Sequence, residues 1–367
     1  MATPRERVLR VLGGMRPDAV PWFGDLDYWA TALIGRGMKP PDFKESGAYI
    51  DWHRNLGVGF YLQGYFPFRM IFDGCRVEER REGPDRIRRI ATPRGELCER
   101  WRWMPESFAE APVDRLLKTA SDLPAYIWLH RHLRYEPEYA FAERRLAQVG
   151  ETGIVLAYLP KSPLMQMVAL DAGICAVVAM KADAPAAFED ALAVVDESHG
   201  RAAAIALASP AEALMIPENL SSEVVGPALY EAHMRLYHKT WTARIRAAGK
   251  RSFIHLDGTL RGLLGRVASA GFEVVEAMTP SPVGDLGVSG WAAFDPSGKV
   301  VFWGGLPGVY FTDLVPDAEF ERHVKAVLAV MRREPRYVLG VADQVPPDGL
   351  EVRVRRVGDL VEEFGRY

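Results

Sequence analysis

Residues 252–278, SFIHLDGTLRGLLGRVASAGFEVVEAM, contain the pattern on which the fold assignment depends. The stretch begins with an apolar run from Ser252 to Leu256, continues with a helical segment from Leu260 to Ala270, and ends with a second apolar run from Phe272 to Ala277. Gly271 stops the helical segment before the second run. Short apolar runs that alternate with amphipathic helices are typical of parallel β-α units. The stretch therefore predicts two neighbouring parallel strands joined by a helix.

The same alternation continues on both sides of this stretch. A helical pattern from Pro227 to Gly249 precedes it, and two further strands, Lys299 to Trp303 and Arg336 to Val341, flank a predicted helix from Asp317 to Arg332. A last helix is expected to end near Phe364. Three or four such units in the C-terminal half, with vaguer ones before them, predict an α/β protein with a (β/α)8 TIM barrel.

The N-terminal third has a different pattern between Asp73 and Trp103. Short charged segments alternate with apolar residues there, and Thr92 to Glu96 has the composition of a turn. This pattern predicts a β-hairpin or meander over approximately residues 73–103. We expect it to be an insertion in a single barrel domain that covers residues 1–367.

Composition and charge exclude several classes of protein. The 45 Lys and Arg residues are balanced by 48 Asp and Glu, so no excess positive charge is present to neutralise a nucleic acid. Residues 1–15 mix arginines with apolar residues and lack the apolar core of a signal peptide. No window is long and apolar enough to span a membrane, so we expect a cytoplasmic protein. The 3 widely spaced cysteines indicate neither a disulfide framework nor a cysteine-rich zinc site.

Chemically active side chains follow the predicted strands of the C-terminal half. His255 and Asp257 alternate at the end of one strand, Glu276 lies near the end of the next, and Asp343 follows the last. Active sites of TIM barrels lie at these carboxyl ends. Each residue alone has a structural explanation, such as an Asx turn at Asp257 and Gly258. Taken together, His255, Asp257 and Glu276 are our candidates for catalysis.

Two kinds of chemistry are open to this set of side chains. One imidazole with two or three carboxylates, His255, Asp257 and Glu276 with or without Asp343, could hold a divalent metal such as zinc, manganese or iron. The alternative is an acid/base pair without a metal. A carboxylate beside His255 is expected to raise the pKa of that imidazole, so that it serves as a general acid near neutral pH.

Other polar and aromatic residues are expected to complete a substrate pocket. They share a position directly after a predicted strand, where the loops of a barrel converge. Trp303 is included because it precedes Gly304 and Gly305 at a predicted strand end. The candidates for substrate binding are Asp25, Asp27, Tyr28, Gln63, Tyr65, Tyr158, Asn219, Trp303 and Asp343.

Several motifs resemble those of the uroporphyrinogen decarboxylase superfamily, which also contains cobamide-dependent methyltransferases. The opening TPRERVL at residues 3–9, followed by RPDAVPW at 16–22, resembles the start of its members. IATPRGEL at 90–97 is similar to the superfamily's hairpin, and residues 248–258 resemble its strand ending in H-x-C-G. The segment 275–285 resembles the EA-x-TP…GD pattern of a branch that has H-x-D-G in place of H-x-C-G. The resemblance implies a barrel fold and makes a homodimer plausible.

The chain departs from both named activities of that superfamily. The decarboxylase binds its octa-acidic substrate with an arginine-rich loop. The corresponding residues 22–29 of this chain, WFGDLDYW, contain two aspartates and no arginine. Like charges would repel such a substrate. The methyltransferases hold zinc with two cysteines, but Asp257 occupies the first cysteine position and residues 341–343 contain no cysteine. A thiolate-rich zinc site is therefore excluded.

Three functions remain open from the sequence. The preferred one is methyl transfer on a small polar substrate, with a corrinoid on a partner protein or a related methyl carrier. The second is decarboxylation or lyase chemistry on a small carboxylic acid, for which Lys161, Arg69 and Arg94 are the candidate cationic groups. The third is a barrel that binds a small molecule without catalysis. The missing cysteine ligands favour this third function, whereas the retained His255, Asp257 and Glu276 favour an enzyme.

Overall fold

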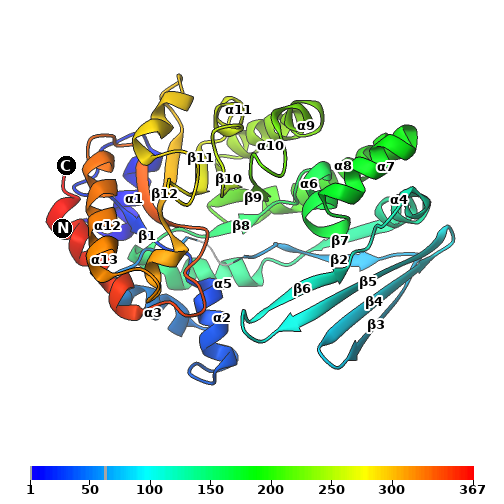
Figure 1. Ribbon diagram of the computed structural model, residues 1–367, viewed down its shortest axis with the longest axis horizontal. Coiled ribbons are helices and arrows are strands. Elements are labelled where there is room, and N and C mark those ends of the chain that lie inside the picture. Colours follow the sequence, from blue (N-terminus) through cyan, green and yellow to red (C-terminus); the bar gives the residue numbers. More distant parts are fainter. Residues whose placement is uncertain (1, 62–63) are drawn as a thin grey trace. The chain divides into compact units, whose positions relative to one another are not determined.

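The computed structural model describes residues 2–61 and 64–367 of the chain (Figure 1). Its contacts group into two compact units, and we describe each unit by itself. The first unit consists of Met1–Tyr65, Tyr139–Tyr158 and Pro210–Tyr367, and the second consists of Phe66–Glu138 and Leu159–Ser209. The sequence predicts one barrel domain with an insertion, and the insertion predicted at 73–103 falls within the second unit.

A curled parallel sheet forms the centre of the first unit, which confirms the predicted α/β class. The sheet has seven strands in the order β1-β13-β12-β11-β10-β9-β8, and every neighbouring pair is parallel. Strands from β9 onward follow one another in both sequence and space, as successive β-α units require. The strands are β1 (Trp22–Phe23), β8 (Leu156–Tyr158), β9 (Ala213–Leu220), β10 (Arg251–Leu256), β11 (Val274–Met278), β12 (Val301–Pro307) and β13 (Tyr337–Ala342).

Residues 58–61 contact both edges of this sheet. Gly59 forms an isolated parallel bridge with Phe23 of β1, and Phe60 forms another with Gly153, just before β8. The Ile154 N–H donates to the Phe60 carbonyl at 3.0 Å. A Cβ atom at position 153 would lie 1.8 Å from that carbonyl oxygen, so only glycine allows this approach. The short segment is thus held between the two edge strands by backbone contacts.

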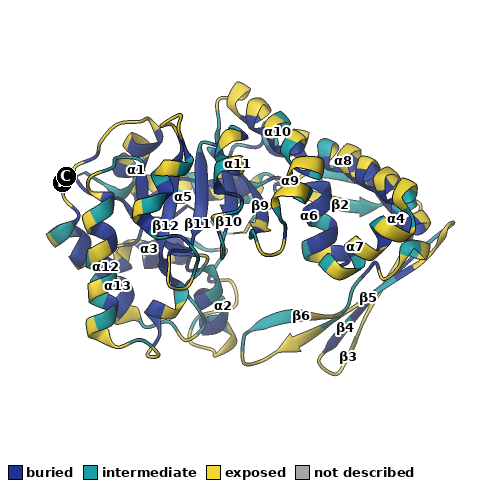
Figure 2. Cartoon of the chain, turned by 45° about the horizontal axis from the view of Figure 1, so that its top comes forward, coloured by how far each residue is buried: buried dark blue, intermediate teal, exposed yellow. Residues whose placement is uncertain are grey.

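Amphipathic helices cover the sheet of the first unit. Figure 2 shows α12 and α13 with one buried face and one exposed face, the pattern expected of helices packed on a sheet. The helices are α1 (Pro4–Leu12), α2 (Asp27–Gly35), α3 (Gly47–Leu56), α5 (Ala140–Val149), α9 (Pro227–His233), α10 (Arg235–Ala247), α11 (Leu264–Ser269), α12 (Asp317–Met331) and α13 (Glu351–Phe364). Short 3-10 segments lie at Gly150–Thr152, Val288–Phe294 and Gly308–Phe311.

Two predicted helices differ from those observed. The helix predicted from Pro227 to Gly249 is interrupted at Met234, which separates α9 from α10. The helix predicted from Leu260 is a turn at its start, and α11 begins only at Leu264. The Asp285 carboxylate explains the second difference, because Oδ1 accepts hydrogen bonds from the backbone N–H groups of Leu260 and Arg261. A side chain that binds backbone N–H groups in this way competes with helix formation.

Trp303 lies in the core of the first unit, not at a strand end as predicted. β12 continues to Pro307, so Trp303 is an interior strand residue with 0% exposure. Its ring packs against Tyr61 and Phe23 with centroid distances of 4.4 and 5.2 Å. Gly340 on the neighbouring strand leaves room for it, since a Cβ there would lie 2.6 Å from the indole. We therefore correct the assignment of Trp303 from substrate contact to core packing.

The second unit contains two antiparallel sheets. The larger has the order β3-β4-β5-β6, and the smaller pairs β2 with β7. The larger sheet includes the predicted hairpin or meander at 73–103. It also contains β6, which was not predicted because Pro112 interrupts its strand pattern. The strands are β2 (Phe68–Phe72), β3 (Arg76–Glu82), β4 (Asp85–Thr92), β5 (Gly95–Met104), β6 (Ala109–Asp114) and β7 (Leu133–Pro137).

Helices accompany the strands of the second unit. The longest, α8, packs against α4 and β7. The helices are α4 (Leu123–His132), α6 (Pro163–Met165), α7 (Ile174–Asp183) and α8 (Pro185–Ala208), with a 3-10 turn at Ala120–Asp122 and a π-helical segment at Gln166–Asp171. Within residues 2–61 and 64–367, no helix combines the length and apolarity that crossing a membrane requires.

Candidate functional site

His255 and Glu276 form a buried pair on adjacent strands of the first unit. Their strands, β10 and β11, run parallel with His255 directly opposite Glu276. His255 Nδ1 and Glu276 Oε2 lie 2.8 Å apart, in a bond donated by the imidazole to the carboxylate. Glu276 Oε1 accepts a second hydrogen bond, from the Tyr61 hydroxyl at 2.7 Å. His255 and Glu276 therefore lie side by side, and the register between β10 and β11 places them opposite each other.

The backbone beside Glu276 departs from regular strand geometry. Ala277 has φ 65°, a left-handed conformation that is unusual for a residue with a side chain. The pairing between β11 and β12 also shifts register between Val275 and Met278. Irregularities of this kind recur next to active sites, where they redirect a side chain. This irregularity lies one residue from the carboxylate that contacts His255.

Neighbouring carboxylates keep the His255 imidazole protonated. Burial alone lowers the pKa of His255, but the charge and hydrogen bond of Glu276, with Asp257 and Asp343, outweigh it and raise the pKa to about 9. At neutral pH the ring is thus an imidazolium that donates from Nδ1 to Glu276. Its second nitrogen, Nε2, also carries a proton in this state. The raised pKa expected from the sequence agrees with this arrangement.

Asp343 lies on the exposed side of the imidazole. Its Oδ1 is 3.7 Å from His255 Nε2, and its side chain is 60% exposed. Desolvation raises the pKa of Asp343, as do the charges of Asp257 and Glu276, while His255 opposes the shift. The backbone of Asp343 has φ 69°, directly after β13. Asp343 is therefore the most accessible carboxylate on this imidazole.

Asp25 is a second buried carboxyl group near the pair. Oδ1 accepts the Asp27 N–H at 2.9 Å, and Oδ2 accepts from Gln344 Nε2 at 3.0 Å. Burial, followed by the charges of Asp27, Glu276 and Asp343, raises the pKa of Asp25 well above its ordinary value. Asp27 itself pairs with Lys44, whose Nζ lies 2.7 Å from Oδ2. The loop after β1 and the start of α2 thus add two carboxyl groups, and Asp25 interacts electrostatically with Glu276 and Asp343.

Tyr158, at the end of β8, belongs to the same environment. Burial and the charges of Asp25, Glu276, Asp27 and Asp343 raise the pKa of its hydroxyl well above the ordinary value. The phenol is therefore neutral at physiological pH. We call His255, Tyr61, Tyr158 and the five carboxyl groups around them the His255 site; those carboxyl groups belong to Asp25, Asp27, Asp257, Glu276 and Asp343.

The other predicted substrate-binding residues vary in placement. Asn219 is exposed with φ 51° near the end of β9. Tyr28 is half-buried in the first turn of α2. Tyr65 packs its ring on Phe141 at 4.8 Å, and its carbonyl accepts the Tyr158 N–H. Gln63 lies outside the described residues.

Sequence reasoning did not single out three residues that contact this site. Tyr61 donates to Glu276, Gln344 donates to Asp25, and Lys44 neutralises Asp27. Tyr61 lies near the end of an apolar run, and Gln344 directly follows the predicted site residue Asp343. Their positions near the ends of predicted strands could therefore have indicated a role in the site. Lys44 lies in a loop between two helices, and its sequence neighbourhood gives no such indication.

The metal interpretation of His255, Asp257 and Glu276 stays a prediction. In the described part of the chain, no three His, Cys, Asp or Glu side chains are grouped so that they could hold a metal ion. A metal on His255 would need an unprotonated ring nitrogen at about 2.0–2.1 Å. Nδ1 donates to Glu276, so Nε2 is the ring nitrogen that such a metal would take. We therefore derive no chemical step through a metal.

Comparison with known proteins assigns the family. The family model described as Uroporphyrinogen decarboxylase (URO-D) matches residues 155–364, which is more than half of the chain. The protein therefore belongs to the uroporphyrinogen decarboxylase family. This range contains His255, Asp257, Glu276 and Asp343. No curated protein matches the sequence significantly.

A solved structure has a similar fold over the whole length. It is a methyltransferase from Methanosarcina mazei, with a TM-score of 0.63 and 14% sequence identity, covering 99% of this chain and 99% of that one. At this identity the similarity concerns the fold alone.

Replacing Asp25 by Asn tests the electrostatics of the site. Because the pKa of Asp25 is raised in the folded state, its folding contribution is lost as pH rises through that pKa. At pH 8 we expect the free energy of unfolding of Asp25→Asn to exceed that of the wild type by about 1 kcal/mol or more. At pH 4 the difference should be smaller.

The matched control for this measurement has the opposite sign. Arg7 lowers the pKa of Asp18 to about 2, so Asp18→Asn should lose stability at neutral pH. Chemical denaturation of both variants at the two pH values checks the pair. If Asp25→Asn is less stable than the wild type at pH 8, the Asp25 carboxylate does not destabilise the fold there, and its pKa is not raised by burial as described.

Proposed function

We propose that the protein is a methyltransferase of the uroporphyrinogen decarboxylase family that acts on a small polar substrate. The observation that carries the proposal is the His255–Glu276 pair, a protonated imidazole held by a buried carboxylate with its second nitrogen toward the exposed Asp343. The fold shared with a methyltransferase from Methanosarcina mazei supports the choice of reaction. We also infer that residues 58–61 act as the eighth strand of a barrel.

Charge argues against the reaction in the family's name. Uroporphyrinogen carries many carboxylates, and a site for it needs cations. The His255 site instead contains five carboxyl groups, of which Glu276, Asp257 and Asp343 act directly on His255, and Lys44 is paired with Asp27. A neutral or cationic substrate meets no such repulsion. We therefore propose a substrate without several negative charges.

In the proposed reaction, His255 serves as a general acid. The bond between the methyl carbon and its heteroatom breaks, the methyl group passes to the nucleophile of the carrier, and the Nε2 proton of His255 moves to the departing heteroatom. A corrinoid on a partner protein is the proposed carrier and would supply that nucleophile. Glu276 holds the imidazole by Nδ1, and Tyr61 fixes Glu276 in turn. Asp343 and Tyr158 would orient the substrate.

The runner-up reaction, decarboxylation or lyase chemistry on a small acid, has less support. It requires a cation for the substrate carboxylate, and the candidates are Arg69, Arg94 and Lys161. Arg69 pairs with Glu136, and Arg94 stands in the exposed turn between β4 and β5. A barrel that binds without catalysis would have no use for a protonated imidazole on a buried carboxylate.

Removing the acid tests the proposed reaction. With reduced cob(I)alamin as the carrier and a panel of small neutral and cationic methylated compounds as donors, the appearance of methylcobalamin absorbance reports methyl transfer. We expect His255→Gln to lower kcat by about 10²–10⁴-fold, the range of general acid catalysis. Wild-type activity should fall as pH rises through about 9, because His255 loses its proton there.

The matched control is His323→Gln, a second histidine of the first unit. His323 Nε2 bonds the Gly305 carbonyl on β12 and takes no part in the His255 site. We expect its activity to stay within about two-fold of the wild type. Full activity of His255→Gln would contradict the assignment of the acid. Release of CO2 from small acids, with no methyl transfer, would favour the runner-up.

A further inference from the structure

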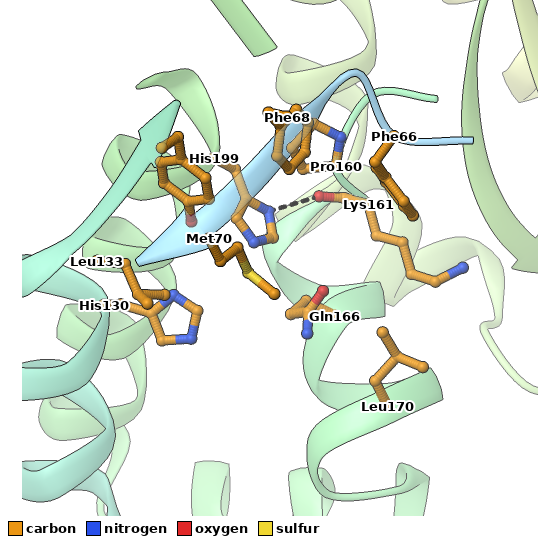
Figure 3. A pocket seen from close by; sticks show the side chains of 11 residues that line it. Phe66, Phe68, Met70, His130, Leu133, Pro160, Lys161, Gln166, Leu170 and His199 are labelled. Carbon is orange, nitrogen blue, oxygen red and sulfur yellow. Dashed lines mark hydrogen bonds between the residues drawn. The ribbon is translucent and has the colours of Figure 1, made fainter. Parts of the chain in front are cut away.

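The second unit encloses a cavity that shares no residue with the His255 site. Its volume is about 260 Å³, and apolar side chains dominate its walls. Figure 3 shows two histidine rings, from α4 and α8, turned toward the same space. The cavity is lined by Phe66, Phe68, Met70, His130, Leu133, Tyr135, Pro160, Lys161, Gln166, Leu170 and His199.

The walls of the cavity suit an aromatic ring. Phe68 lies edge-on to Tyr135 and tilted against Phe66, each at a centroid distance of 5.5 Å. Phe66, Met70 and Leu170 remain 40%, 52% and 38% exposed, an unusual concentration of large apolar side chains around one opening. An apolar cavity of about 150 Å³ holds one benzene molecule. The larger volume here accommodates a ring with a short substituent.

One buried polar group in the cavity has no partner. His130 is 5% exposed, and its Nδ1 is buried without a hydrogen bond to any residue that the structure describes. Leaving such a nitrogen unsatisfied costs about 1–3 kcal/mol in general. His199, also 5% exposed, donates from Nδ1 to the Lys161 carbonyl at 2.8 Å, so its Nε2 is the acceptor in the neutral ring.

The head group of a ligand at this end of the cavity should be neutral. Burial and the neighbouring His199 and Arg201 lower the pKa of His130 well below its ordinary value, so the ring is uncharged. Asp171, the nearest carboxyl group to Gln166, is engaged by Gln166 and by Tyr126. The Lys161 side chain extends away from the two histidine rings (Figure 3). A hydroxyl group both donates and accepts, so it can pair with His130 Nδ1 whether or not that nitrogen carries the proton.

We propose that this cavity binds a small aromatic molecule with a hydroxyl group, which places its ring among Phe66, Phe68 and Met70 and its hydroxyl on His130. The proposal is independent of the reaction at the His255 site. The occupant is defined by its chemistry: an apolar ring of the size of the cavity and one uncharged head that hydrogen-bonds an imidazole.

Calorimetric titration of the full-length protein with three matched probes tests the proposal. The probes are 4-ethylphenol, ethylbenzene and 4-ethylbenzoate, which share a ring and differ in the head group. We expect 4-ethylphenol to bind about tenfold more tightly than ethylbenzene, the effect of one satisfied hydrogen bond. Equal affinity of these two probes, tighter binding of 4-ethylbenzoate, or no binding of any probe would overturn the proposal.

Two variants locate the binding. His130→Phe keeps an aromatic ring but removes the imidazole, so it should abolish the preference for 4-ethylphenol while ethylbenzene still binds. Met70→Trp, at a half-exposed position, should fill the cavity and weaken both probes at least tenfold without loss of the native melting transition. Should His130→Phe fail to fold, Met70→Trp alone decides, because unchanged binding in that variant would place the probe elsewhere and refute the site.

Discussion

Replacing Glu276 by Gln is expected to lower the pKa of His255 from about 9 to near its ordinary value of 6.5. Burial already opposes the charged ring, and Glu276 contributes both the largest favourable charge and the hydrogen bond that overcome it. A carboxamide at position 276 keeps the shape and the bond to Tyr61 but removes the negative charge. The ring would then lose its proton around neutral pH. Titration of the His255 ring resonances by NMR measures this shift directly.

The same substitution changes how stability depends on pH. Because the folded pKa of His255 lies above the unfolded value of 6.5, the protonated ring stabilises the fold fully below pH 6.5. This contribution disappears as pH rises to about 9, and its full size is about 3 kcal/mol for a group that is 8% exposed. The Glu276→Gln variant should lack that decline in denaturation experiments.

Asp257→Asn is the control for Glu276→Gln. It also removes one negative charge near His255, but Glu276, not Asp257, holds the imidazole by a hydrogen bond. We expect a clearly smaller decrease in the pKa of His255. A pKa that stays above 8 in Glu276→Gln would mean that another group holds the proton, and the assigned pair would be wrong.

Replacing Gly153 by Ala is expected to destabilise the first unit by about 3 kcal/mol or more. The added Cβ would lie 1.8 Å from the Phe60 carbonyl oxygen, and both partners there are backbone atoms that cannot rotate away. The bridge between residues 58–61 and the strand edge would have to open. Thermal or chemical denaturation measures the loss, and failure to accumulate folded protein is an equally expected result.

Gly57→Ala is the control for this steric argument. Gly57 has φ 71°, and a Cβ there would meet no atom within 4 Å. Only backbone strain of about 1 kcal/mol opposes alanine at that position. Similar stability of the two variants would show that residues 58–61 do not pack against Gly153 in solution, and the inferred eighth strand would lose its basis.

Local pattern was sufficient for the strands that carry the site. The run from Ser252 to Leu256 and the one ending at Ala277 both proved to be parallel strands, and His255 and Glu276, predicted near the ends of these two strands, lie opposite each other. Apolar periodicity reports burial, which local sequence encodes well. The end of β12 was missed because Gly304 and Gly305 look like a turn, whereas in the folded chain they continue the ladder to Pro307.

Contacts between distant segments could not be predicted in the same way. Tyr61 and Glu276 are 215 residues apart, and only the closed packing of the first unit brings the hydroxyl to the carboxylate. Lys44 reaches Asp27 from a loop without a recognisable pattern. The bond between His255 Nδ1 and Glu276 likewise depends on mutual distances, which residue types alone do not give.

The register between β10 and β11 has a consequence for the evolution of new specificities. His255 and Glu276 are positioned by strand pairing inside the core, whereas the segments that follow these strands and β13 are loops, where sequence variation is generally tolerated. Gly284, Asp285 and Gln344 are exceptions, because they make close backbone or hydrogen-bond contacts. Libraries randomised at residues 259–261, 280–283 and 345–348 are therefore expected to sample new substrates while the His255–Glu276 pair is kept. In this fold, the strands position the reacting side chains, and the loops that follow them can change substrate specificity separately.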